Sequence, residues 1–167
     1  SKFFQKKHQS STIFYKNLPF LKTKDINRFD LFIFHGGKQS ANSKSKAILY
    51  EYKFLNNIIK KNKPIVGICL GAQLIAKIYG SKISKSKAKL FECGYKKNLK
   101  TNNKFFQNNL SFLQFHTEGI SYNKNMELLS KGILYEVDSF KIKRKDIYGF
   151  QFHPEVTSNT IKRWHNI

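Results

Sequence analysis

Cysteine, methionine, tryptophan and arginine are all scarce in this chain of 167 residues. The two cysteines, Cys69 and Cys93, can form at most one bridge, so a disulfide-stapled fold is excluded. Because no secretion signal is recognisable either, we expect both thiols to be free and reduced. The five histidines show no close ligand spacing, and we expect neither a metal site nor a cofactor.

Long hydrophobic runs are also missing. No apolar stretch approaches the ~18 residues of a membrane-spanning helix, and the charged start of the chain lacks the apolar centre of a signal peptide. Linkers rich in proline or glycine are absent, and a hydrophobic content of 40% is enough for one core. We predict a single domain over residues 1–167 that is soluble, cytoplasmic and not bound to a membrane.

Acidic residues are few: 10 against 31 lysines and arginines, which gives a formal net charge of +21. Such a charge suits a nucleic-acid-binding protein, because phosphate binding releases counterions. Only three of the basic residues are arginines, however, whose planar fork is favoured in phosphate and base-edge recognition. The lysines are scattered and occur with other residues that have A/T-rich codons. We expect a solvated basic surface rather than a nucleic-acid site, which would need lysines and exposed aromatic rings on one face.

The alternation of apolar segments predicts an α/β fold. Amphipathic helices are expected at 48–63, at 70–79 and from about 158, and strands at 11–18, 30–34, 64–68, 111–115, 133–136, 139–143 and 147–152. The order strand, helix, strand, helix between residues 30 and 79 indicates parallel strands with right-handed connections. We predict a three-layer, flavodoxin-like, mostly parallel sheet with a β-rich C-terminal addition.

The first residues do not fit this scheme completely. Residues 1–9 have a helical pattern with no strand before them. The first, central strand customary in a doubly wound fold is therefore expected to be absent from this chain. Either the N-terminus is truncated or the fold has lost that strand.

Residues 67–73, "GICLGAQ", place Cys69 at the point where a buried strand gives way to a helix. Gly67 and Gly71 leave room for a sharp turn, as in the G-x-S-x-G elbow of hydrolases. The helix N-terminus directs partial positive charge at the sulfur, which favours the thiolate, and the amide of Leu70 is positioned to donate to an oxyanion. We predict that Cys69 is a nucleophile; the alternative is a buried, inert thiol.

A cysteine nucleophile needs a base, and residues 151–155, "QFHPE", offer one. Pro154 biases His153 toward an extended conformation, in which residues two apart share a face. Glu155 can then orient the imidazole of His153 toward the thiol of Cys69. We predict a Cys-His-Glu triad, against the alternative that His153 and Glu155 are only a surface pair.

Five segments of the chain resemble a known family. The residues "GICLGAQ" and "FQFHPEV" (150–156) are similar to the two signatures of class I glutamine amidotransferases, triad enzymes that hydrolyse glutamine to glutamate and ammonia. The segment "IFHGG" (33–37) resembles their oxyanion strand, and "FECGY" (91–95) resembles their E-x-G segment. "LQFHTEG" (113–119) resembles the corresponding stretch of the GMP-synthase-like, stand-alone branch.

The resemblance implies a role for each matching residue. Cys69 would attack the side-chain amide of glutamine and form a γ-glutamyl thioester, while His153 moves the protons and Glu155 holds its tautomer. The amides of Gly37 and Leu70 would bind the oxyanion. The substrate-binding residues that the resemblance implies are Gln73, Phe115, His116 and Glu118.

The resemblance also implies a partner. Ammonia has to reach an acceptor, and the chain contains no P-loop motif with which to activate one, so we expect a separate ammonia-accepting synthetase domain or subunit. Two alternatives stay open. One is a γ-glutamyl hydrolase or peptidase that uses the same triad, and the other is a weakly active regulatory subunit, because His35 stands where the family usually has proline.

Overall fold

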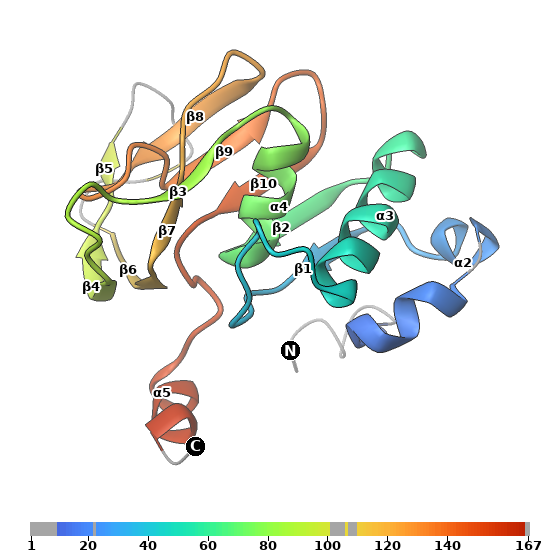
Figure 1. Cartoon of the computed structure of the whole chain (residues 1–167), viewed down its shortest axis with the longest axis horizontal. Helices are drawn as coiled ribbons and strands as arrows, with labels where there is room; N and C mark the ends of the chain where they lie inside the picture. The colour runs from blue at the N-terminus through green and yellow to red at the C-terminus, as the bar shows by residue number, and fades with distance from the viewer. Residues whose placement is uncertain (1–9, 22, 101–105, 107–109, 166–167) are drawn as a thin grey trace.

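The structure is a computed structural model that describes residues 10–21, 23–100, 106 and 110–165 (Figure 1). The helix predicted at residues 1–9 lies outside these ranges. Among the helices of the described ranges, none is long and apolar enough to cross a membrane.

A six-stranded sheet forms the centre of the molecule. Its strands, in spatial order, are β1 (Phe32–Phe34), β2 (Ile65–Ile68), β10 (Ile147–Phe150), β9 (Ser139–Ile142), β8 (Met126–Lys131) and β5 (Leu99–Lys100). The first three are mutually parallel, whereas β9, β8 and β5 extend the sheet with antiparallel pairings. The predicted α/β fold with a β-rich C-terminal addition is confirmed.

Two helices follow the parallel strands, as predicted. Helix α3 (Lys46–Lys60) begins at Ser45, whose side chain accepts a hydrogen bond from the amide of Ile48, an N-cap that satisfies one free helix donor. Helix α4 (Leu70–Ile78) starts directly after β2 and ends before Gly80, whose φ of 101° suits glycine at a helix end. Helix α4 packs against β1, β2 and β10, so it carries the elbow on the parallel part of the sheet.

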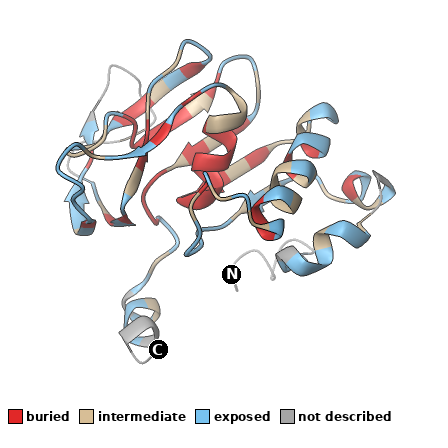
Figure 2. Cartoon of the chain, in the orientation of Figure 1, coloured by how far each residue is buried: buried red, intermediate tan, exposed pale blue. Residues whose placement is uncertain are grey.

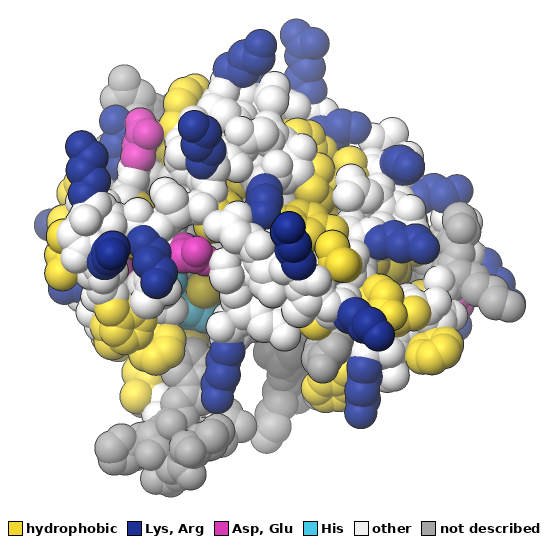
Figure 3. Space-filling model, viewed as in Figure 1, with side chains coloured by type: hydrophobic (Ala, Val, Ile, Leu, Met, Phe, Trp, Pro, Cys, Tyr) yellow, Lys and Arg dark blue, Asp and Glu magenta, His cyan; other side chains and the backbone are white. Residues whose placement is uncertain are grey.

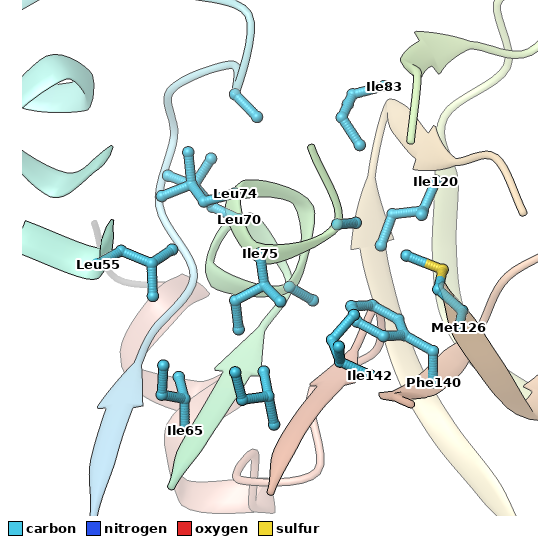
Figure 4. Close-up of a cluster of buried hydrophobic side chains, with 14 of the residues drawn as sticks. Leu55, Ile65, Leu70, Leu74, Ile75, Ile83, Ile120, Met126, Phe140 and Ile142 are labelled. Carbon is cyan, nitrogen blue, oxygen red and sulfur yellow. The ribbon is translucent and has the colours of Figure 1, made fainter. Parts of the chain in front are cut away.

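The hydrophobic core lies between α4 and the sheet, where Figure 2 shows the buried residues concentrated. Leu74 and Ile75 of α4 are fully buried, and they meet Ile65 of β2 and Phe140 of β9 in one cluster (Figure 4). Leu55 of α3 extends this cluster on the other side of α4. The elbow therefore rests on the buried hydrophobic core.

The strand predicted at residues 11–18 is wrong. Residues 10–14 have no regular structure, and a 3₁₀ helix, η1 (Tyr15–Phe20), follows and leads to the short helix α2 (Thr23–Asn27). Residues 11–14 and β1 line a cavity of about 400 Å³ between them. The cavity separates the segment from β1, the edge strand of the sheet, and among the described residues no strand pairing joins the two.

The strand predicted at residues 133–136 is also wrong. The strand of this region is β8, and residues 133–136 form bends after Gly132. The hydroxyl of Tyr135 donates to the carbonyl of Thr117 and accepts from the amide of Ser86, so this segment holds other loops instead of extending a sheet.

Two small antiparallel pairs complete the β structure. Strand β3 (Ile83–Lys85) pairs with β7 (Glu118–Ile120), and β4 (Glu92–Lys97) pairs with β6 (Ser111–His116). Of these strands only β6 was predicted. The C-terminal helix α5 (Ser158–His165) is present where the sequence indicated.

The basic side chains do not gather in one patch on the face that Figure 3 shows. Lysines and arginines are spread over this face and separated by hydrophobic and neutral groups. The expected solvated basic surface agrees with this view, and the absence of nucleic-acid binding stays a prediction.

Candidate active site

Cys69 occupies a strained turn between β2 and α4. Its φ of 49° and ψ of −107° lie where non-glycine residues are rarely found, a conformation that persists only where the surroundings enforce it. The amide of Cys69 donates to the carbonyl of Phe150 on β10 at 2.7 Å, and its carbonyl accepts the amide of Gln73 at 3.0 Å. The thiol is free, and the residue is buried. These are the features of a nucleophile elbow.

The glycines beside Cys69 are required by close backbone approaches. A methyl group at Gly67 would lie 2.7 Å from the amide nitrogen of Ala72, and one at Gly71 would lie 2.7 Å from the carbonyl carbon of Phe34 on β1. Neither neighbour is the mobile end of a side chain. The spacing of glycines predicted from the sequence therefore has a steric cause.

His153 and Glu155 form a close pair in the loop after β10. The Nδ1 atom of His153 lies 2.8 Å from Oε1 of Glu155. The amide of His153 donates to the carbonyl of Leu113 on β6 at 2.9 Å, which fixes the backbone of the base. Together these bonds determine which way the imidazole faces.

The charges of this pair are coupled to the thiol. Burial alone lowers the pKa of His153, but side-chain hydrogen bonds with Cys69 and Glu155 outweigh it and raise the pKa to about 9. Burial raises the pKa of Glu155, yet the hydrogen bond with His153 and the nearby charges of His153 and His35 leave it below its usual value. The structure thus brings the three predicted triad residues together, with the imidazole between the thiol and the carboxylate.

Gly36, in the loop after β1, lies close to both Cys69 and His153, and the sequence did not single it out. A methyl group at Gly36 would lie 2.9 Å from Cε1 of His153 and 3.4 Å from Cβ of Cys69. A methyl group at Gly37 would instead meet the side chain of Leu70 at 2.9 Å. Gly37 and Leu70, the predicted oxyanion residues, are therefore neighbours beside the elbow.

Gln73 lies on the first turn of α4, and its side chain is buried. Its Nε2 atom donates to the carbonyl of Glu118 at 2.8 Å and to Oε1 of Gln151 at 3.2 Å. Gln73 thus ties the elbow helix to the start of β7 and to the segment between β10 and His153. Gln73, which was predicted to bind the substrate, therefore bridges two other segments of the site in this structure.

The remaining predicted substrate residues lie on β6 and β7. His116 is buried: Nδ1 contacts the carbonyl of Glu118 at 3.0 Å, and Nε2 contacts Oε1 of Gln114 at 2.9 Å. Phe115 faces outward with 48% of its surface exposed and packs edge-on against Phe91. Glu118 contributes its carbonyl to the bonds with Gln73 and His116.

Several buried polar residues of this region were missed. Gln151, Gln114 and Glu92 lie within the segments that the resemblance highlighted, but no role could be read from their spacing. Asp138 lies outside every such segment, and nothing in the sequence indicates it. Among the described residues there is no group of three or more histidine, cysteine or acidic side chains that could hold a metal ion.

Comparisons with known proteins identify the family of the chain. The family model for class-I glutamine amidotransferases matches residues 3–164. A subunit of the glutamine-hydrolyzing GMP synthase of Methanococcus aeolicus is 36% identical over 107 residues, which cover 62% of this chain and 56% of that protein. The corresponding protein of Methanobrevibacter smithii is 38% identical over 97 residues, 56% of this chain and 50% of that protein.

Solved structures are similar over more of the chain. The crystal structure of a glutamine amidotransferase from Thermotoga maritima superimposes with a TM-score of 0.87 at 27% identity, covering 99% of this chain and 73% of that one. The chain spans about half the length of the curated relatives named above.

Proposed function

This chain belongs to the class-I glutamine amidotransferases, and we propose that it hydrolyses the side-chain amide of L-glutamine to glutamate and ammonia. The observation that carries the proposal is the strained Cys69 at the elbow, hydrogen-bonded to an imidazole that Glu155 orients. A merely structural cysteine would require neither the strained turn nor the adjacent base.

The first half of the reaction forms an acyl-enzyme. Cys69 gives its proton to His153, and the sulfur attacks the carboxamide carbon of glutamine, forming a C–S bond while the carbonyl oxygen becomes an oxyanion. The amides of Gly37 and Leu70 stabilise this oxyanion. As the tetrahedral species collapses, the C–N bond breaks, and His153 donates its proton to the departing nitrogen, which leaves as ammonia.

The second half regenerates the thiol. His153 removes a proton from water, the resulting hydroxide attacks the thioester carbon, and the C–S bond breaks to release glutamate. Glu155 keeps Nδ1 of His153 protonated throughout, so Nε2 remains available to the sulfur and the water. The raised pKa of His153, about 9, supports an imidazolium that can protonate the leaving group at neutral pH.

Glutamine selectivity would come from the segment around β6 and β7. The backbone at Phe115 and His116, with Glu118, would bind the α-amino and α-carboxylate ends of the substrate. Gln73 holds this segment against the elbow helix through the carbonyl of Glu118. A substrate without these polar ends would leave the segment unpaired, which disfavours its binding.

The ammonia would pass to a synthetase. The relatives are subunits of glutamine-hydrolyzing GMP synthases, and their names imply a second component that uses the ammonia. We propose that this chain likewise serves a separate ammonia-accepting synthetase domain or subunit.

The proposed function can be tested by the ratio of glutamate to ammonia that the protein releases. Glutamate and ammonia would be measured after addition of glutamine to the wild-type chain and to Cys69→Ser, with a γ-glutamyl dipeptide as the alternative substrate. We expect equimolar glutamate and ammonia from glutamine only, and none from Cys69→Ser. Faster hydrolysis of the dipeptide would overturn glutamine as the substrate, and unchanged activity of Cys69→Ser would overturn the nucleophile.

A further inference from the structure

A line of buried polar side chains runs inward from the proposed substrate segment. His116 contacts Oε1 of Gln114 at 2.9 Å, and Nε2 of Gln114 lies 2.7 Å from Oδ1 of Asp138. The other carboxyl oxygen of Asp138 accepts from the hydroxyl of Ser130 at 3.5 Å, and Ser130 pairs with Ser139 at 2.6 Å. Asp138 is 3% exposed, although none of the proposed catalytic steps uses it.

If every group in this line has its usual charge, the hydrogen-bond donors and acceptors cannot all be paired. The carbonyl of Glu118 can only accept, so the proton of a neutral His116 must lie on Nδ1. Nε2 of His116 is then an acceptor that faces Gln114. If the amide nitrogen of Gln114 turns toward His116, its oxygen faces the carboxylate of Asp138, again acceptor against acceptor.

One additional proton resolves the conflict. It lies either on Nε2 of His116, which then donates to Gln114, or on Asp138, which then donates to the oxygen of a turned Gln114. In both arrangements the three side chains are fully paired. Buried polar groups are rarely left unpaired, because an unsatisfied group has lost its hydrogen bonds to water without replacing them.

The surroundings favour the proton on the carboxyl group. Burial raises the pKa of Asp138 to about 6, despite hydrogen bonds from Gln114 and Ser130 that lower it. Burial lowers the pKa of His116 to about 4, and the charge of His153 lowers it further, against the bond to the carbonyl of Glu118.

Glu92 is the third titratable group of the cluster. Its Oε2 lies 3.5 Å from Nε2 of His116. Burial and the charge of Asp138 raise its pKa, while the amide of Leu134 and the charge of Lys96 lower it. The cluster therefore contains two buried carboxyl groups beside one imidazole.

We propose that Asp138 is a positioning residue: it shares a proton with Gln114 and His116, and the resulting bonds hold residues 116–118 in the conformation that binds glutamine. This inference rests on the proposed function. When the proton is lost, Gln114 can satisfy only one of its two neighbours, and the anchor of His116 is released. The loss acts on substrate binding, because the hydrogen bonds of this line, among the described residues, do not include Cys69 or Glu155.

The experiment compares the pH dependence of KM and kcat for glutamine in the wild type and in Asp138→Asn. An asparagine amide donates to Gln114 at every pH, so this variant keeps the bond without titrating. From about pH 5 to about pH 8 we expect the KM of the wild type to rise about fivefold or more, while the KM of Asp138→Asn stays flat and low. The kcat profiles of the two proteins should coincide.

Two further variants complete the comparison. Asp138→Leu removes the bond at every pH, and its KM should be high throughout. Asp146→Asn, an exposed acid in the turn before β10, is the matched control and should follow the wild type. A KM profile of Asp138→Asn that rises like that of the wild type would overturn the proposal.

A measurement without turnover separates this proposal from the proposed function. The ¹³C shift of the Asp138 carboxyl group and the ¹⁵N shifts of the His116 ring would be followed against pH in the resting protein. We expect the carboxyl group to titrate well above the usual range of an aspartate, and the ring shifts of His116 to change with it. A carboxylate ionised throughout, beside an uncharged imidazole, would overturn the shared proton whether or not the protein hydrolyses glutamine.

Discussion

The close approach between α4 and β1 at Gly71 should be essential to catalysis. In Gly71→Ala the new methyl group would overlap the carbonyl oxygen of Phe34 and lie 2.7 Å from its carbonyl carbon. Neither backbone can yield by rotating a side chain, so α4 and β1 must separate. Overpacking of this kind costs about 3 kcal/mol, which corresponds to a fall in Tm of about 6–12 °C for a chain of this size.

The effect on activity should be larger than the effect on stability. Phe34 leads into Gly36 and Gly37, so a displacement of β1 moves the proposed oxyanion donor away from the thiol. A misplacement of about 1 Å costs on the order of 100-fold in rate. The assay is kcat/KM for glutamine beside thermal unfolding of the same preparation.

Gly80→Ala is the matched control, because it lies just after the same helix. Its φ is 101°, but a methyl group there meets nothing within 4 Å. We expect this variant to lose about 1–2 kcal/mol of stability from backbone strain and to keep its activity. Wild-type kcat/KM in Gly71→Ala, or an equal loss of activity in Gly80→Ala, would refute the steric explanation of the elbow.

Two other changes test the triad directly. Gly36→Ala inserts a methyl group 2.9 Å from His153, and it should lower kcat about 100-fold while the protein stays folded, as circular dichroism would check. Glu155→Gln should lower kcat by about 100-fold or more, because the imidazole loses the partner that fixes its tautomer. The stability that Glu155 contributes is present above its usual pKa of 4.5 and is lost as the pH falls through the lowered value. The stability that His153 contributes is present below its usual pKa of 6.5 and is lost as the pH rises through about 9. Both contributions are complete between pH 4.5 and pH 6.5, so the unfolding free energies of the wild type and of Glu155→Gln should differ most in that range. A difference that does not change with pH in denaturant titrations would contradict the pairing.

The elbow and the base segment could be predicted from the sequence because their geometry is local. Two glycines flank Cys69 within five residues, and His153 and Glu155 share a face of one extended segment. Each of these short patterns therefore predicts its own local conformation. The distance between the two segments could not be calculated from either. Their pairing was inferred from the need of a cysteine nucleophile for a base and from the resemblance, and the sheet accounts for it by placing β2 beside β10.

The features that the sequence did not reveal depend on pairings distant in the chain. Strand β4 has little hydrophobic alternation of its own and is stabilised by its pairing with β6, which brings Glu92 opposite His116. Asp138 reaches the same cluster from the residue before β9. Residues 11–14 have the composition of a strand, but among the described residues they pair with no strand and only face β1 across a cavity, so composition alone was misleading there.

Formation of a covalent intermediate on Cys69 is the most direct test of the whole account. The chain would be mixed with glutamine, quenched in acid within milliseconds to seconds, digested, and analysed by mass spectrometry for a glutamyl group on the peptide that contains Cys69. The account predicts this adduct at Cys69 and its decay at the rate of glutamate release. Glutamate release by the wild type without any adduct at Cys69, or an adduct at Cys93 instead, would contradict the central claim.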